Sequence, residues 1–496
     1  MELIDTSPSP EQDASVTASP DSQSLRRNAL GTGGIVFMVI SAAAPLTIIA
    51  GVAPLAILIG GVSAPLAYTV AGIILGIFAI AFMAMTRYVK ALGGFYTYIT
   101  QSLGKAVGLG SSFVALVSYN ALQIGLYGLM GTQGHEMLKN EFGIDVPWWV
   151  IAGIGIAAVF LVAWRGIDVG AKVLGVLLAL EALILVVLAV VILAQGGAEG
   201  ITFGTFDAGN LFNPGMFAIL GVGFAAFMGF ESTALYREEA RDPEKTIPRA
   251  TYISVIFMAV FYGFILWAII IGLGESQAVA AAGENPAGLV FAEAGHYLGA
   301  WAELVMYLLI LTSVYASQLA FHNAINRYTF SLARDGVLPK ALHRVDAATG
   351  SPVVSGLVQT VLAVIVVGAF AVFGLDPYLQ LLLWVNSPGV IGIIALQVLT
   401  CVAVVVFFVR NRELARKWYV IPAAIVSGVL QLGILYVLCS SFDLLTAAGP
   451  AVNAILIAIT PVTFLVGIVL ALVWKRTRPD VYARIGGASE FAEATR

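Results

Sequence analysis

The chain has 496 residues, of which 59% are hydrophobic and only 11% are charged, and its mean hydropathy is +0.94. Soluble domains are about half apolar and a quarter charged, so this composition excludes a string of soluble domains and predicts one all-α integral membrane domain. The net charge of −4, without a clustered basic surface, argues against nucleic acid as a partner. Cys401 and Cys439 lie inside apolar runs without the spacing of metal ligands, so no metal or other cofactor is expected.

Residues 1–29 are rich in Ser, Pro and acidic residues, and Arg26 and Arg27 come shortly before the first apolar run. This composition predicts a disordered tail. The apolar run begins near Ile35 and is too long for a cleaved signal peptide, so we expect it to stay as the first membrane helix.

A hydrocarbon core of about 30 Å needs roughly 20 helical residues. Twelve apolar runs are predicted to cross it, at 33–58, 62–86, 107–131, 147–165, 172–194, 213–236, 250–273, 297–326, 352–374, 378–409, 418–440 and 449–474. The membrane domain is therefore expected to cover 30–474, with a second tail at 475–496.

The basic residues fix the expected orientation. With twelve crossings, every Lys and Arg except Lys139 falls on one face. Positive charge is enriched on the cytoplasmic side, so both tails are predicted to be cytoplasmic in a plasma or inner cell membrane.

Two of the runs contain interruptions. Pro45 follows Ser41-Ala42-Ala43-Ala44 and removes a backbone donor, and Gly221, Gly223 and Gly229 come before Glu231. Broken helices at corresponding positions of two inverted repeats are typical of secondary transporters, which predicts repeats at 30–196 and 210–409, with helices 11 and 12 at 418–474. The alternative is that Pro45 only kinks a packed helix and that the glycines only allow close helix contact.

Several motifs resemble those of the amino acid/polyamine/organocation permeases. The segments 229–231 (GFE), 238–243 (EEARDP) and 247–250 (IPRA) are similar to the helix 6 signature of that family. Three further stretches agree with the family. Between helices 2 and 3 they are Gly93-Gly94 with Tyr96, Tyr98, Leu103, Gly104 and Gly108, and at the end of helix 8 they are Asn323, Arg327, 333–336 (ARDG) and Leu338-Pro339. The match at Arg478-Pro479, Tyr482 and Gly486 is weaker. The resemblance implies a leucine-transporter-like fold of five plus five helices with two trailing helices.

The resemblance also implies a substrate site between helices 1, 3, 6, 8 and 10. Free amides around Ser41, Ala42, Ala43 and Ala44 are expected to meet a substrate carboxylate, since helix N-termini favour anions. Carbonyls beside Phe227 and Gly229 are expected to receive an ammonium group. The other candidates are polar residues of helix 3 (Tyr119, Asn120, Gln123 and Tyr127) and an aromatic wall at Phe321.

Helix 5 departs from the family pattern. Many amino acid carriers of this family have a lysine near its middle, where alignment on Gly170-Ala171-Lys172 places Glu181. An ionised side chain near the bilayer midplane costs at least about 2.5 kcal/mol unless it is paired or hydrated. We therefore hypothesise that Glu181 carries a coupling proton; the alternative is a permanently protonated carboxyl bonded to a neighbouring helix. Glu231 is expected to gate the cavity or to bond the unwound amides.

Three classes of protein compete for this sequence. No HExxH, GxSxG or Walker lysine motif is present, so an enzyme is not expected. A channel is expected to repeat one polar stripe through an oligomer, which this chain with two distinct broken helices does not suggest. A membrane sensor with the same fold is kept as an alternative. The favoured prediction is a proton-coupled symporter for a small neutral amino acid, with an amine or polyamine permease (ethanolamine, putrescine) or an exchanger as the alternative. His322 is interpreted as a packing residue, with a role in transport as the alternative.

Overall fold

A computed structural model describes residues 30–89, 94–165, 167–207, 209–210, 214–237, 239–346, 349–414 and 417–486. Within these ranges the regular secondary structure is helical, apart from one isolated bridge between Leu30 and Ala240. The predicted tail at 1–29 lies outside the described residues, as do Gly93 and Glu238 of the family motifs.

Each predicted membrane run corresponds to a helix or a broken helix. The long helices are α3 (Ala64–Thr86), α5 (Lys105–Phe142), α6 (Trp148–Arg165), α7 (Ile167–Gln195), α9 (Pro243–Leu273), α12 (Ala300–Arg334), α13 (Val353–Val372), α14 (Leu383–Arg410), α15 (Val420–Ser440) and α17 (Pro450–Thr477). The first run is divided into α1 (Thr32–Ala43), η1 (Thr47–Val52) and α2 (Ala53–Gly60), and the sixth into α8 (Pro214–Ala225) and η5 (Phe230–Tyr236).

Ten helical stretches of the described chain are long and apolar enough to cross a membrane. One of them, Thr32–Thr86, has 55 residues and contains two of the predicted runs, and the sixth run is a shorter apolar stretch at Ile219–Ala234. The protein is therefore an all-α multi-pass membrane protein in which helices 1 and 6 are broken, as predicted.

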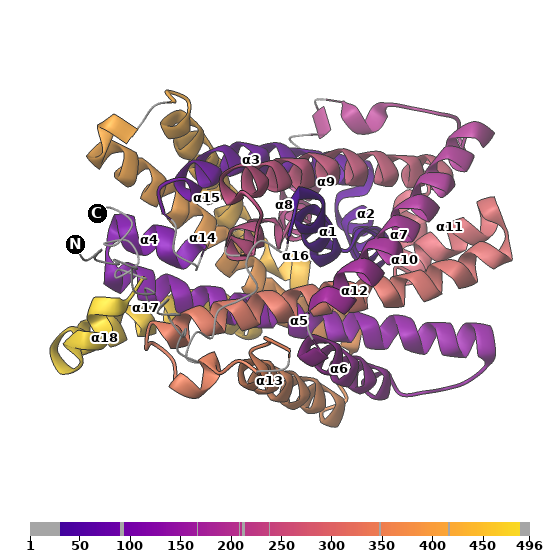
Figure 1. The fold of residues 1–496 in the computed structure, drawn as a ribbon. Coiled ribbons are helices and arrows are strands. Elements are labelled where there is room, and N and C mark those ends of the chain that lie inside the picture. The colour runs from indigo at the N-terminus through magenta and orange to yellow at the C-terminus, as the bar shows by residue number, and fades with distance from the viewer. Residues whose placement is uncertain are drawn as a thin grey trace, which may run out of the picture.

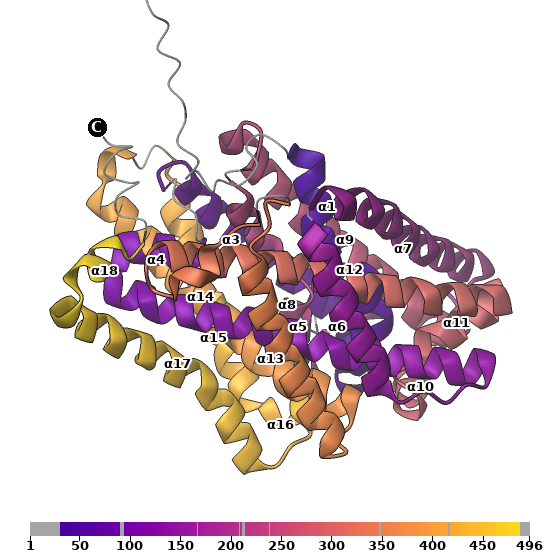
Figure 2. The same ribbon diagram turned by 60° about the horizontal axis from the view of Figure 1, so that its bottom comes forward.

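Short helices close the two ends of the bundle. Figures 1 and 2 show α4 (Phe95–Leu103) and α18 (Pro479–Arg484) at one end, and α10 (Ala278–Glu284) and α11 (Leu289–Leu298) at the other. Both ends of the described chain lie at the α4 end. The Leu30 amide donates to the backbone carbonyl of Glu239, and the Leu30 carbonyl accepts from the backbone amide of Arg241. The Gly486 amide donates to the Tyr96 hydroxyl. A chain that crosses the membrane an even number of times has both ends on the same side, which explains this arrangement.

Burial separates inner from outer helices. In the most apolar window of Thr32–Thr86, 83% of residues are buried, whereas in that of α17 only 11% are. α17 therefore lies at the rim, where its apolar side chains face lipid, and the broken helices lie inside. In this interior α12 packs against both α1 and α5, so these helices position the candidate site.

Candidate functional site

The first helix break follows Ala43. Ala44 has a left-handed backbone (φ 45°) and still donates its amide to the Ile40 carbonyl, which closes α1. Pro45 has no amide to continue the ladder, and the chain resumes as a π-helical turn at Thr47. The predicted interruption of helix 1 is therefore confirmed.

At the end of α1, the backbone groups that lack a partner within the helix are carbonyls, not amides. The Ala42 carbonyl accepts a hydrogen bond from the Ser317 hydroxyl (2.6 Å), and the Ala43 carbonyl accepts one from Tyr262 (3.4 Å). Amides without a partner in their own helix occur after Pro45, where the Thr47 amide donates to Ser313 Oγ at 3.3 Å. A role of Ser41–Ala44 in carboxylate binding stays a prediction, and the available donors lie on the other side of the break.

Glu181 of α7 reaches this same break. Its side chain is 1% exposed and interacts with the Ser313 hydroxyl of α12 and the Leu46 backbone amide. One carboxyl oxygen, Oε2, has no hydrogen-bond partner among the described residues. The carboxyl group therefore lies where helix 1 restarts, within a small polar cluster that also contains the Thr47 hydroxyl, which donates to Ser313 at 3.0 Å.

The second break lies between α8 and η5. Gly229 has φ 106°, a conformation that glycine adopts without strain. The Phe227 carbonyl accepts from the Phe230 amide (3.3 Å), and the Gly229 carbonyl accepts from the amide and hydroxyl of Ser232. These two carbonyls, expected to hold an ammonium group, are satisfied by tight turns of their own segment.

The two breaks are in contact. A Cβ atom added at Gly229 would lie 3.1 Å from the Cβ atom of Ala42. Glu231, which is 2% exposed, accepts hydrogen bonds from the Gly229 amide (3.1 Å) and from the Tyr119 hydroxyl of α5 (2.9 Å). Glu231 thus bonds an unwound amide and connects the helix 6 break to helix 3.

The other helix 3 candidates form contacts within the bundle. Gln123 and Gln318 donate side-chain amides to each other's backbone carbonyls, at 3.3 and 3.0 Å. Asn120 is half-buried and donates to Leu116 of its own helix. Phe321 lies beside the Tyr119 ring, with centroids 6.4 Å apart.

A cavity of about 220 Å³ begins at the two breaks. Among the predicted residues, Ala42, Ala43 and Phe321 line it, whereas the remaining predicted site residues are not part of the lining. Sequence reasoning missed most of the wall, whose members are mainly apolar and include Ile48, Leu55, Leu122, Leu126, Val222, Met228, Leu382 and Val390. The cavity extends to Ala447 and to Leu58 of α2, and α2 packs against α10, which lies at the end opposite α4 (Figure 1).

Comparison with known proteins identifies the family. The sequence profile described as amino acid permease matches residues 30–480. The chain belongs to the amino acid permease family. A curated relative of this permease is the branched-chain amino acid permease BcaP of Lactococcus lactis, which is 24% identical over 62% of this chain and 68% of the relative.

Two further relatives are more partial. An uncharacterized transporter of Mycobacterium tuberculosis is 28% identical over 57% of the permease and 63% of its own length. The lysine-specific permease LysP of L. lactis is 29% identical over 39% of the permease and 36% of its own length. These alignments cover less than two thirds of either relative.

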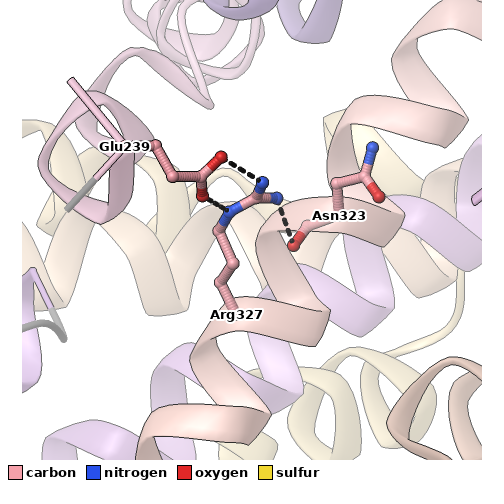
Figure 3. A network of polar contacts seen from close by, with 3 residues as sticks. All are labelled: Glu239, Asn323 and Arg327. Carbon is pink, nitrogen blue, oxygen red and sulfur yellow. Dashed lines mark hydrogen bonds and ion pairs between the residues drawn. The ribbon is translucent and has the colours of Figure 1, made fainter. Parts of the chain in front are cut away.

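A buried ion pair lies at the α4 end of the permease. Arg327 Nε lies 2.7 Å from Glu239 Oε1, and both side chains are 5% exposed (Figure 3). Arg327 also donates to the Asn323 carbonyl, and its guanidinium lies 4.8 Å from the centre of the Tyr236 ring. This group joins α12 to the segment that follows η5.

A second contact at this end involves the end of the described chain. The Tyr96 hydroxyl donates to Asp335 Oδ2 (2.8 Å) and accepts from the Gly486 amide (2.6 Å). Ile485 is fully buried beside them. The residues of the Gly93–Gly108 and Ala333–Pro339 motifs therefore meet one another, although they are more than 200 positions apart in sequence.

His322 is buried in α12, and its Nε2 has no partner among the described residues. Its carbonyl accepts from Gln359 of α13 (3.1 Å), and a Cβ added at Gly356 would lie 3.0 Å from Nε2. These contacts agree with a packing role between α12 and α13.

Proposed function

We propose that this permease carries a neutral amino acid with an apolar side chain across the cell membrane by alternating access, coupled to a proton. The observation that carries the proposal is the apolar cavity that ends at two meeting helix breaks. Small-molecule sites are mainly apolar pockets with a few convergent polar groups. The polar groups here are the backbone of Ala42 and Ala43 and the side chains of Thr47, Ser317, Asn386 and Ser387.

The charge of the lining favours a neutral substrate. The described residues that line the cavity include no Asp, Glu, Lys or Arg, so a second cationic group of a lysine or a diamine lacks a partner there. BcaP, a relative named for branched-chain amino acids, agrees with this choice. LysP, named for lysine, is similar over a much shorter stretch.

Proton coupling is assigned to Glu181. The carboxyl group is buried between the helix 1 break and Ser313, and one of its oxygens is unpaired among the described residues. Ionisation in this position is costly while the site is closed, and water entering an opened site reduces that cost. Opening and closing of the cavity would therefore release and take up a proton beside the helix 1 break, where the substrate binds.

The orientation proposed from the basic residues places the Glu239–Arg327 end in the cytoplasm. The cavity then opens toward the external side, and the ion pair closes the path inward. The structure is accordingly assigned to an outward-facing state, from which inward release requires separation of Glu239 and Arg327.

The test is uptake of radiolabelled leucine, alanine, lysine and putrescine into proteoliposomes, with and without an inward proton gradient. We expect gradient-dependent accumulation of leucine, lost in Glu181→Gln while exchange of internal for external leucine persists. The matched control is Glu303→Gln in the first turn of α12, which should accumulate leucine normally. Gradient-driven accumulation by Glu181→Gln would overturn the coupling role, uptake only into preloaded vesicles would indicate an exchanger, and preference for putrescine would indicate an amine permease.

A further inference from the structure

A second cavity, of about 360 Å³, lies at the α4 end of the bundle. It is formed by the last turns of α3 and α14 and the first turns of α9 and α15. The Tyr88 hydroxyl donates to the Leu414 carbonyl (3.0 Å), which holds the α14–α15 connection beside α3. The volume falls in the range of small-molecule sites, roughly 300–1,000 Å³.

The lining of this cavity carries an excess of positive charge. Arg87, Arg249 and Lys417 are exposed, and none of them has an ion-pair partner among the described residues. Lys245 also lines the cavity but pairs with Asp242 at 2.9 Å, and Glu244 is the one carboxylate in the described lining. Three cations without counter-ions against one carboxylate leave a net charge that suits an anion.

Aromatic and apolar groups surround these cations. Tyr88, Tyr252 and Tyr419 line the cavity, and Lys417 Nζ lies 5.6 Å from the centre of the Tyr419 ring. The neighbouring Trp418 is 83% exposed, which is typical of side chains at the membrane–water interface. The cavity thus lies at the depth of the lipid headgroups.

The cavity continues onto a surface that faces lipid. Ile253 and Ile256 follow Arg249 along α9 and are 49% and 63% exposed. Exposed isoleucines on a membrane-spanning helix contact acyl chains. A ligand with a charged head in the cavity would therefore find an apolar path for its tail directly beside it.

We propose that this cavity binds the phosphate-bearing headgroup of an anionic phospholipid, with its acyl chains along the Ile253–Ile256 face of α9. Basic pockets between membrane helices on the cytoplasmic side favour such headgroups. Assignment to the cytoplasmic leaflet rests on the orientation proposed above, whereas the site itself does not depend on the transported substrate. A bound headgroup would bridge the α3–α9 pair and the α14–α15 pair.

The experiment is native mass spectrometry of the purified full chain in detergent, titrated with phosphatidylglycerol or with zwitterionic phosphatidylcholine. The test variant combines Arg87→Gln, Arg249→Gln and Lys417→Gln. The matched control removes the same charge from the same end of the bundle through Lys340→Gln, Lys475→Gln and Arg476→Gln. Since a basic residue near an anionic headgroup contributes about 1 kcal/mol, we expect phosphatidylglycerol affinity to fall on the order of a hundredfold in the test variant and little in the control.

A variant that is expected to bind the lipid more tightly distinguishes a specific loss of binding from misfolding. Glu244→Gln removes the carboxylate from the lining and should strengthen phosphatidylglycerol binding. Equal losses in the test and control variants, or unchanged binding in the test variant, would overturn the site. Displacement of the lipid by inorganic phosphate or glycerol 3-phosphate at equal concentration would overturn the lipid and assign the site to a soluble phosphate.

Discussion

Arg327 and Glu239 form a buried, two-pronged ion pair at the end of the bundle that carries α4. The guanidinium Nε and Nη2 atoms lie 2.7 and 3.1 Å from the two carboxyl oxygens. The pair joins α12 to the segment after η5, and both side chains are 5% exposed. In the inward release proposed above, these two groups separate and water reaches both of them.

Substitution of Arg327 by Met should shift the permease toward a state open at this end. Removal of one partner leaves a buried carboxylate unpaired, at a cost of about 3–5 kcal/mol to the closed state. In a background lacking Cys401 and Cys439, a cysteine placed at the buried Ala324 should react with a polar maleimide at least tenfold faster in Arg327→Met.

The control for this prediction is Lys245→Met. Lys245 and Asp242 form an ion pair whose side chains are 68% and 55% exposed, and such pairs contribute little. Its labelling rate should match that of the parent. Equal rates in the Arg327→Met variant and the parent would show that the buried pair does not hold this end closed.

Gly229→Ala should abolish transport without unfolding the protein. The alanine would have to adopt φ 106°, at a cost of roughly 1–2 kcal/mol, with its Cβ 3.1 Å from that of Ala42. The crowding falls where the two broken helices meet, so we expect uptake to fall at least tenfold while the elution volume in gel filtration stays unchanged.

Gly433→Ala is the matched control, because Gly433 lies inside α15 with nothing within 4 Å of the added Cβ. This variant should be equal to the parent or more stable by up to about 1 kcal/mol. Full activity in Gly229→Ala would contradict a functional role for the close approach of the breaks.

The breaks and the burial of Glu181 could be predicted from sequence because each depends on local chemistry. Pro45 cannot donate to the helix ladder, Gly229 permits a left-handed backbone, and an acidic residue in the middle of an apolar run lies at mid-membrane depth. Their mutual contact could not be predicted in this way, since Ala42 and Gly229 lie far apart in the chain.

The hydroxyl partners and the cavity wall were missed for a physical reason. Ser313 and Ser317 bond residues of helix 1, yet a serine in a membrane helix often bonds a carbonyl of its own helix, as Ser387 does here. Likewise, apolar side chains such as Leu382 and Val390 face the cavity, and in sequence they look like side chains that face lipid. Only the packing of the helices distinguishes these cases.

Ala225→Leu should change the size of substrate that the permease accepts. Ala225 is the last residue of α8 and lines the cavity of about 220 Å³, so three added carbon atoms reduce the space for a substrate side chain. We expect the KM for leucine to rise about tenfold, with a much smaller effect on alanine, measured by initial rates of uptake. An equal change for both substrates would place the leucine side chain elsewhere.

Glu293 should make the stability of the protein depend on pH. It lies in α11, outside the membrane-spanning segments, with its carboxyl against Gly272 of α9 and Oε2 without a partner among the described residues. Burial raises the pKa of Glu293 from its ordinary 4.5 to about 7. The folded state therefore holds this proton more tightly than the unfolded state, so the stability present below pH 4.5 is lost as the pH rises toward 7.

Glu293→Gln removes this ionisation and should be more stable than the parent at pH 8 by roughly 1 kcal/mol, since part of the carboxyl is still screened by solvent. At pH 4.5 the two proteins should unfold at nearly the same temperature, as followed by tryptophan fluorescence in detergent. Glu284→Gln removes the same charge from an exposed position in α10 and serves as the control. A stability difference between Glu293→Gln and the parent that is the same at both pH values would mean that the carboxyl of Glu293 ionises as freely in the folded protein as in the unfolded chain.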